Sequence, residues 1–434
     1  MNILRVEVMQ EWAEIMKEVA ADSSLTGLCM VSGKPGGSVY GADIAEFNTL
    51  ASEADVHNLI ALAASVLSAI EKLDIPTVCG IDGVAVGGGL EIALPFDRIV
   101  GVGQRHTKLG FPEINLGIFP GYGGTGRALR RVGIKTTLDM VLSGRLLGAE
   151  EALSHQLIDR LAEDPNSLRD IMREELANPR NPDRVEGDAE FAAALQAAEE
   201  DYCSSAIEAA TPAPFEIIQH FKRSGGDWRK LVTSEGKAFA PLLLGEASYH
   251  LRRVFLINDA VRKTARGDSQ ISHVHVIGAG TMGGDIAAVA ALNGFSVSLS
   301  DREASAVEKA VLRAASLFER RLKTDKAIAD ANSRLIADVA GAYIGNADII
   351  IEAVAERLEV KQAVFKEVEK AAKPGAILAT NTSSIMIEDI AASLNQPERL
   401  IGLHFFNPVP VLPLVEVIFG AQSDSDVLAR AMCF

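Results

Sequence analysis

The stretch Val84-Ala85-Val86-Gly87-Gly88-Gly89-Leu90-Glu91 joins an apolar run to three consecutive glycines and a carboxylate. Because glycine loses more backbone entropy on folding than any other residue, three in a row indicate a place where Cβ atoms would not fit. The continuation through Leu94 predicts a helix start, whose free N–H groups and positive dipole end suit an oxyanion. A packing turn between strand and helix explains the glycines equally well, so this stretch alone leaves both interpretations open.

Strands and helices alternate around this stretch, which is typical of an α/β unit. Apolar residues at helical spacing predict helices over 3–21, 54–72 and 126–143, and short apolar runs predict strands at 28–32, 77–81 and 98–102. From 145 to 265 the pattern is mostly helical, with polar breaks at 164–166 and 178–188.

The composition is that of an acidic, globular chain of 434 residues with 48% hydrophobic residues and a formal net charge of −16. Such a charge repels nucleic acid and anionic membranes, so neither is an expected partner. The pattern predicts no transmembrane segment and no signal peptide. The four cysteines show neither metal-type nor disulfide spacing, which predicts a reducing compartment and no metal site: Cys29, Cys79, Cys203 and Cys433.

A second α/β unit begins after the polar segment 264–272. Its first strand runs into Gly278-x-Gly280-x-x-Gly283 and a helix, and Asp301 lies 23 residues after Gly278 at the end of the next strand. This is the context that a dinucleotide fingerprint requires. The pyrophosphate would rest on the helix N-terminus, and Asp301 would accept hydrogen bonds from the adenosine ribose, which favours NAD. A doubly wound domain without a nucleotide is the alternative. Further strands are predicted at 348–352, 376–380, 400–404 and 414–419.

A histidine ends one of these strands. His404 stands at the carboxyl end of its strand, where α/β sheets bind ligands, and Glu416 follows 12 residues later in the apolar run 414–417. A carboxylate in such a run is costly unless it is paired, and pairing with His404 would make the imidazole a better general base. Spacing alone nevertheless favours a structural histidine and an edge-strand glutamate.

Two further carboxylates lie in glycine- or proline-rich apolar sequence. If Glu91 and Glu113 converge on one cavity, one could activate a water while the other moves a carbon-bound proton. The N–H of Ala42, which follows Gly41, could complement that of Gly88. The alternative is that Glu91 is an acidic residue in the first helical turn that stabilises the helix through its dipole, and that Glu113 is a surface loop residue.

Taken together, these motifs resemble known families. Residues 41–44, 87–91, 111–113 and 120–125 resemble the crotonase (enoyl-CoA hydratase) superfamily in order and spacing. Residues 271–420 resemble the NAD domain of 3-hydroxyacyl-CoA dehydrogenases through Asn381-Thr382-Ser383-Ser384 and the segments 404–410 and 414–417. The two in tandem, joined by helices that contain Phe255-Leu256-Ile257-Asn258-Asp259, resemble the α-subunits of fatty-acid β-oxidation multienzyme complexes.

The resemblance implies a role for each matching residue. The N–H groups of Ala42 and Gly88 would form an oxyanion hole for a thioester enolate. Glu91 would activate the water that adds at C3, and Glu113 would deliver the proton to C2. His404 would take the proton of the 3-hydroxyl while hydride passes to NAD, and Glu416 would orient it. Implied cofactor contacts are Gly278, Gly280, Met282, Gly283, Asp301, Val354, Ala355, Glu356, Lys361, Ser383 and Asn407, and implied substrate contacts are Gly121, Asp259, Ser383 and Asn407.

The expected architecture is α/β, with a crotonase-type ββα spiral domain, a helical linker and a Rossmann NAD-binding domain. The expected boundaries are 1–185, 186–269 and 270–420, with 421–434 starting a further region. Family members extend beyond both ends, so we expect a fragment with impaired activity.

The expected function is hydration of 2-enoyl-CoA and NAD-dependent oxidation of the resulting 3-hydroxyacyl-CoA, with isomerisation as a family side activity. A thiolase β-subunit is the expected partner. The expected location is cytoplasmic for a bacterial protein and mitochondrial for a eukaryotic one. The alternative function is a non-catalytic CoA- or NAD-binding scaffold subunit of a thiolase complex.

Overall fold

The computed structural model describes residues 2–34, 37–104, 106–178, 183–184, 187–203, 210–264 and 267–434. The chain forms two compact units, Met1–Asp259 and Ala260–Phe434. This division falls inside 186–269, the segment expected to be a helical linker. Helix α11 (Glu246–Thr264) begins in the first unit and ends in the second.

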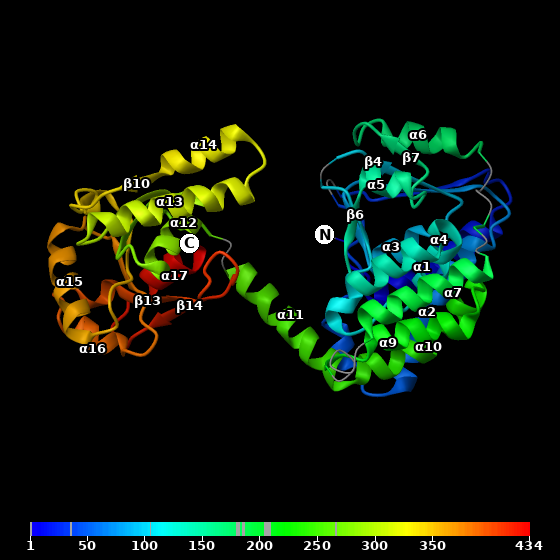
Figure 1. Cartoon of the computed structure of the whole chain (residues 1–434). Coiled ribbons are helices and arrows are strands. Elements are labelled where there is room, and N and C mark those ends of the chain that lie inside the picture. Colours follow the sequence, from blue (N-terminus) through cyan, green and yellow to red (C-terminus); the bar gives the residue numbers. More distant parts are fainter. Residues whose placement is uncertain are drawn as a thin grey trace. The chain divides into compact units, whose positions relative to one another are not determined.

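The first unit contains two small sheets that alternate along the chain (Figure 1). One is fully parallel, in the order β1-β2-β4-β7, and the other has the order β3-β5-β6. The bounds are β1 Leu28–Val31, β2 Thr77–Ile81, β3 Val84–Val86, β4 Arg98–Val102, β5 Lys108–Gly110, β6 Leu146–Gly148 and β7 Arg160–Ala162. Strand β2 leads into β3, and β4 leads into β5, so the chain passes twice from the parallel sheet to the three-stranded sheet. This arrangement is a ββα spiral. Strands β6 and β7 lie where the sequence predicts mostly helix.

Helices surround these sheets and build one large apolar core, and a second, smaller cluster lies where α6 packs on the parallel sheet. Helix α10 packs against α2, α4 and α9, so much of the expected linker belongs to this core. The bounds are α1 Val6–Ala21, η1 Glu46–Thr49, α2 Glu53–Glu71, α3 Gly88–Ala93, η2 Pro112–Leu116, α4 Gly124–Ser143, α5 Ala149–Ser154, α6 Leu168–Glu175, α7 Asp188–Tyr202, α9 Ala213–Ser224 and α10 Trp228–Leu244. By length and composition alone α2 could cross a membrane, so sequence does not exclude a spanning helix. Here α2 buries Val56, Ala63 and Leu67 against its neighbours.

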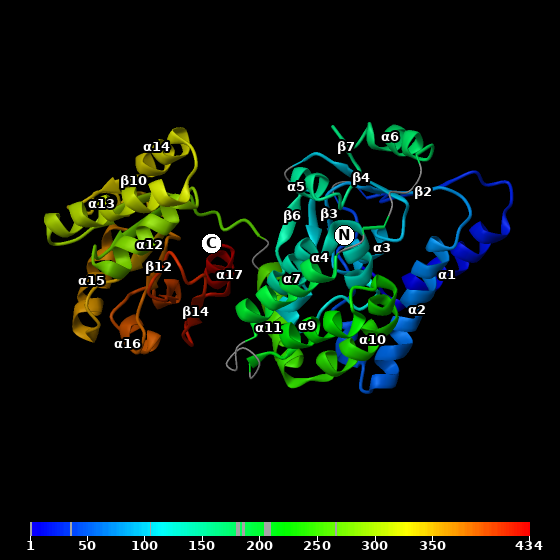
Figure 2. The same ribbon diagram turned by 45° about the vertical axis from the view of Figure 1, so that its right-hand side comes forward.

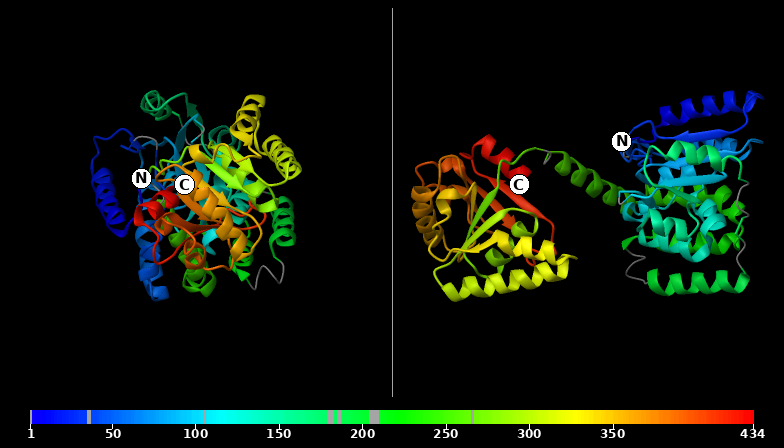
Figure 3. Two further views of the ribbon diagram at one scale, coloured as in Figure 1. Left: turned by 90° about the vertical axis from the view of Figure 1, so that its left-hand side faces the viewer. Right: turned by 90° about the horizontal axis from the view of Figure 1, so that it is seen from above.

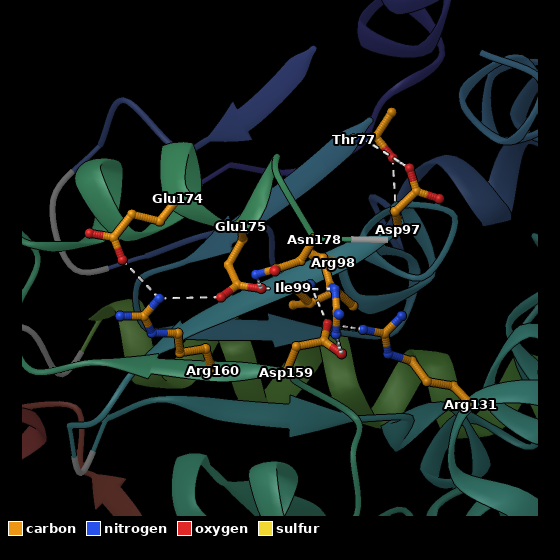
Figure 4. Close-up of polar contacts among 10 residues, drawn as sticks. All are labelled: Thr77, Asp97, Arg98, Ile99, Arg131, Asp159, Arg160, Glu174, Glu175 and Asn178. Atoms are coloured by element: carbon orange, nitrogen blue, oxygen red, sulfur yellow. Dashed lines mark hydrogen bonds and ion pairs between the residues drawn. The ribbon is translucent and has the colours of Figure 1, made fainter. Parts of the chain in front are cut away.

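A polar network ties the parallel sheet to α4 and α6 (Figure 4). Asp159, which precedes β7, accepts from the N–H of Ile99 at 2.6 Å and pairs with Arg98 and Arg131. Arg160 pairs with Glu174 and Glu175 of α6. Asp159 thus joins β4 to α4, and Arg160 joins β7 to α6, so these contacts hold the parallel sheet against its helices.

The second unit is a seven-stranded sheet in the order β10-β9-β8-β11-β12-β13-β14. All neighbours are parallel except β13 and β14. Helices α12 and α13 cover one face, and α15 and α16 cover the other (Figures 2 and 3). The bounds are β8 His273–Ile277, α12 Thr281–Leu292, β9 Ser296–Ser300, α13 Ala304–Arg321, α14 Asp325–Arg334, β10 Leu335–Ala337, η3 Ile344–Asn346, β11 Ile349–Glu352, α15 Leu358–Ala371, β12 Ile377–Thr380, α16 Ile387–Ala391, η4 Pro397–Arg399, β13 Leu400–Phe405, β14 Val415–Phe419 and α17 Ser425–Cys433. This is the doubly wound arrangement that the sequence predicts.

Candidate functional site

The first unit holds a cavity of about 390 Å³ that brings five predicted residues together. Ala42, Gly88, Glu91, Glu113 and Gly121 all line it, although they are spread over 80 positions of sequence. Most of the remaining wall is apolar, with the side chains of Ile44, Phe47, Leu116, Ile118, Phe119, Phe239 and Phe255. Such a wall suits an acyl chain, and the few polar groups are confined to one part of it.

The glycine-rich stretch brings two backbone segments into close contact. Gly87 has φ +54°, a region that favours glycine, and Gly88 is the first residue of α3. A Cβ on Gly88 would lie 3.5 Å from the backbone nitrogen of Ala42, so the two N–H groups are neighbours. The N–H groups of a first helical turn have no intrahelical acceptor. The N–H groups of Ala42 and Gly88 can therefore form an oxyanion hole.

Glu91 is 2% exposed and is held from one side by backbone donors. Its Oε1 accepts from the N–H of Tyr122 at 2.7 Å and of Gly124 at 2.8 Å. Burial raises the pKa of Glu91 to about 7, against the opposing effect of these hydrogen bonds and of the Arg127 charge. The group can therefore exchange a proton near neutral pH.

Glu113 comes from η2 and reaches the same wall. A Cβ on Gly87 would lie 2.7 Å from its Oε1, so the glycine leaves room for the carboxylate. Among the described residues its buried Oε2 has no hydrogen-bond partner. Burial, and next the neighbouring Glu91 charge, raise the pKa of Glu113 well above its ordinary value. A carboxylate that accepts from two neighbouring N–H groups, beside one whose Oε2 has no donor among the described residues, is an arrangement for separate base and acid roles.

In the second unit the predicted glycines form a tight strand-to-helix turn. Gly278 has φ +103°, and its Cβ would lie 2.6 Å from the carbonyl oxygen of Ala353. A Cβ on Gly283 would lie 1.8 Å from the carbonyl oxygen of Gly278, whereas one on Gly280 would meet open space. Asp301 accepts from the N–H of Ala279 at 2.7 Å, which fixes the carboxylate beside the turn. These features fit the pyrophosphate and ribose of NAD.

A cluster of charged side chains lies at the carboxyl end of β11 in the same sheet. Lys361 is fully buried, and its Nζ lies 2.9 Å from Glu352 and 3.2 Å from Glu356. Burial alone would raise the pKa of Glu356, but donors from Thr382 and Ser383 and the Lys361 charge outweigh it and lower the pKa to about 2. Lys361 therefore stands behind Glu356 in this structure, and a direct contact from Lys361 to NAD stays a prediction.

His404 and Glu416 form a hydrogen-bonded pair, although their spacing alone favours two structural residues. They face each other across β13 and β14, with Nδ1 of His404 2.8 Å from Oε2 of Glu416. Asn381 fixes the end of β13, because its Oδ1 accepts from the N–H of Phe405 at 2.9 Å. The predicted Met282, Val354, Ala355, Ser383 and Asn407 also lie just beyond strands of this sheet edge. Parallel strands place their carboxyl ends on one side, so these groups share an edge.

One predicted residue lies outside the lining of the cavity in the first unit, and one buried residue beside Glu91 was not predicted. Asp259 lies on α11 and is not among the residues that line the 390 Å³ cavity, so its substrate contact stays a prediction. Glu235 of α10 was not singled out, although it is 1% exposed and bonded to the turn beside Glu91. Helix α10 also carries Arg229, Lys230 and Lys237, so no feature of its sequence distinguishes Glu235 from an ordinary helical charge.

Two family models match the chain. Residues 1–181 match enoyl-CoA hydratase/isomerase, and residues 273–434 match 3-hydroxyacyl-CoA dehydrogenase, NAD binding domain. The first match covers only part of the first compact unit, and helices α7–α11 lie between the two matched segments.

Similar proteins extend over the whole chain. Fatty acid oxidation complex subunit alpha from Shewanella halifaxensis is 33% identical over 454 residues, covering 100% of this chain and 64% of that protein. The same-named protein from Pseudomonas putida is 32% identical, covering 98% of this chain and 62% of its own length. The chain thus spans less than two thirds of these relatives. A crystal structure of 3-hydroxybutyryl-CoA dehydrogenase from Escherichia coli is 41% identical with a TM-score of 0.36, covering 38% of this chain and 35% of that one.

Proposed function

Because the chain belongs to the enoyl-CoA hydratase/isomerase and 3-hydroxyacyl-CoA dehydrogenase families, we propose that it carries out two successive steps of fatty acid β-oxidation. The first unit hydrates a 2-enoyl-CoA to a 3-hydroxyacyl-CoA. The second oxidises that product to a 3-oxoacyl-CoA with NAD. The observation that carries the proposal is the convergence of Glu91, Glu113 and the Ala42 and Gly88 N–H groups on one apolar cavity.

Hydration follows from the different surroundings of the two carboxylates. Ionised Glu91 accepts a proton from water, whose oxygen adds to C3, and protonated Glu113 gives its proton to C2. As the C2–C3 double bond is lost, charge develops on the thioester oxygen, where the Ala42 and Gly88 N–H groups stabilise it. The raised pKa of Glu113 keeps it protonated while Glu91 ionises.

Oxidation uses the edge of the second sheet. When bound, NAD supplies the acceptor for the C3 hydride. His404 removes the proton of the 3-hydroxyl through Nε2, because Nδ1 is occupied by Glu416. Ser383 and Asn407 hold substrate and cofactor, and Asp301 holds the adenosine ribose.

The family relation supports two further proposals. The subunit name of the relatives implies a complex, and a thiolase β-subunit would consume the 3-oxoacyl-CoA. Four free cysteines fit a reducing compartment, so we place the protein in the cytoplasm of a bacterium or the mitochondrion of a eukaryote. A non-catalytic scaffold is the competing function, and the four acid–base side chains in paired positions argue against it.

Loss of the conjugated-thioester absorbance of crotonyl-CoA tests the first activity directly. The 434-residue chain should remove it, and Glu113→Gln should slow the reaction at least about a hundredfold. Equal rates for both proteins would reject the hydratase assignment. Adding NAD should then yield NADH, and His404→Ala should abolish NADH while preserving NAD binding.

A further inference from the structure

The turn before and at the start of α4 distributes its N–H groups between two carboxylates. Successive donors from Tyr122 to Thr125 point alternately to opposite sides. The N–H groups of Tyr122 and Gly124 serve Glu91, at 2.7 and 2.8 Å. The N–H groups of Gly123 and Thr125 point away from the cavity, and they too donate hydrogen bonds.

Glu235 is the acceptor on that second side. Its Oε1 accepts from the N–H of Gly123 at 2.5 Å, and its Oε2 accepts from the N–H of Thr125 at 3.1 Å and from the Thr125 hydroxyl. The carboxylate is 1% exposed and does not line the 390 Å³ cavity. The hydrogen bonds of Glu235 therefore reach the site only through the turn.

The turn needs support from this side. Gly123 has φ +93°, and a Cβ there would lie 2.2 Å from Nη1 of Arg127, so the backbone is tightly enclosed. Arg127 in turn donates to the carbonyl oxygen of Tyr122 at 2.7 Å and pairs with Glu71 of α2. With Glu235 from α10, three helices fix the backbone that holds Glu91.

Helix α10 lies outside the segment that matches the hydratase family, yet it supplies two parts of this region. Phe239, one turn after Glu235, lines the cavity and lies against Gly121. The first unit therefore depends on residues well beyond 181 for its acid–base geometry.

We propose that Glu235 is a positioning residue for hydration: it clamps Gly123 and Thr125 so that the alternate N–H groups keep the Glu91 carboxylate facing the substrate water. This inference rests on the proposed hydratase function. The charges that interact with Glu235 are those of Glu91 across the turn and of Glu113 beyond it.

The electrostatics couple the two carboxylates. Burial, and next the Glu91 charge, raise the pKa of Glu235 to about 8. Glu91 therefore ionises before Glu235, and the charge that Glu235 then acquires raises the pKa of Glu113.

The variant Glu235→Gln keeps the size of the side chain but removes its charge. We expect kcat for crotonyl-CoA hydration to fall about tenfold with KM within about threefold, because substrate contacts are untouched. The alkaline limb of the pH profile, where Glu113 loses its proton, should move to lower pH, because the Glu235 charge raises the pKa of Glu113. Lys237→Gln, on the exposed side of the same helix, is the control and should change neither.

A second measurement does not depend on activity. A carboxyl whose folded pKa is raised contributes stability below its unfolded pKa, and that contribution is lost as pH rises through the folded value. The urea midpoint of the wild type relative to Glu235→Gln should therefore decrease from about pH 4.5 to 8. If Glu235→Gln does not fold, Thr125→Val, which removes only the hydroxyl donor, should shift kcat in the same direction.

Unchanged kcat and an unchanged alkaline limb in Glu235→Gln would overturn the inference while leaving the hydratase assignment intact. A lower kcat with no movement of the alkaline limb would also overturn it, since a merely structural role predicts that result. If the wild-type chain has no hydratase activity, the proposed function is rejected instead. The pH dependence of the urea midpoints then still tests whether the pKa of Glu235 is raised.

Discussion

Nδ1 of His404 lies 2.8 Å from Oε2 of Glu416, directly across the antiparallel pair β13 and β14. The contact leaves Nε2 as the ring nitrogen for chemistry, because the carboxylate selects the Nδ1–H tautomer. Register alone sets this pair, since opposite residues on neighbouring strands bring their side chains to the same face.

Glu416→Gln should therefore lower the rate of NADH formation from 3-hydroxybutyryl-CoA by about a hundredfold, because the imidazole loses its orientation and the charge that stabilises the imidazolium. NAD affinity, followed by fluorescence titration, should stay within about twofold. Glu308→Gln, an exposed site on α13, is the matched control. A normal turnover in Glu416→Gln would make this pair structural.

Hydration should depend on pH in a bell-shaped manner. Burial raises the pKa of Glu91 to about 7, so activity should fall as pH drops through that value and Glu91 becomes protonated. The pKa of Glu113 is raised further, so activity should fall again at higher pH, when the acid loses its proton. The two limbs belong to the coupled pair, and Glu113→Gln should abolish the upper one. A flat profile between pH 6 and about 9 would contradict the acid–base assignment.

Two glycines of the fingerprint should respond differently to alanine. A Cβ on Gly283 would lie 1.8 Å from the carbonyl oxygen of Gly278, so Gly283→Ala should force the turn apart and lower the melting temperature of the second unit. A Cβ on Gly280 meets open space, so Gly280→Ala should fold normally and weaken NAD binding at least about tenfold, because the pyrophosphate would occupy that space. Calorimetry and NAD titration of both variants separate the two effects. Equal NAD affinity in Gly280→Ala and wild type would place the cofactor elsewhere.

Local pattern predicted the elements well where strands were long and bounded by glycine or a polar residue. The fingerprint located β8 at 273–277, and its ends agree with the structure. Strands β6 and β7 have three residues each, too few to show a period of two, and they fell inside a region predicted as mostly helical.

The site residues also divide into those that a local sequence pattern predicts and those that it does not. Site residues that are close together in sequence, such as Gly88 and Glu91, can be predicted from the local pattern of glycines and carboxylates. Glu235 bonds to Thr125 across 110 residues, and no local rule connects a helical glutamate to a distant turn. The apolar wall is equally non-local, because Phe239 joins it only through the packing of α10 on α4.

The buried Lys361 cluster gives the last prediction. Its ammonium is the cation beside Glu352, which is fully buried and also accepts from Thr380 at 2.7 Å. Lys361→Met leaves that charge uncompensated, so the free energy of unfolding of the second unit should fall by about 3–5 kcal/mol. Adding Glu352→Gln should recover much of the loss, because the amide removes the unpaired charge and still accepts from Thr380. Urea unfolding of the two single variants and the double variant measures the coupling. Additive losses would mean that the charges do not interact, and the cluster would then have no part in holding Glu356 beside the cofactor edge.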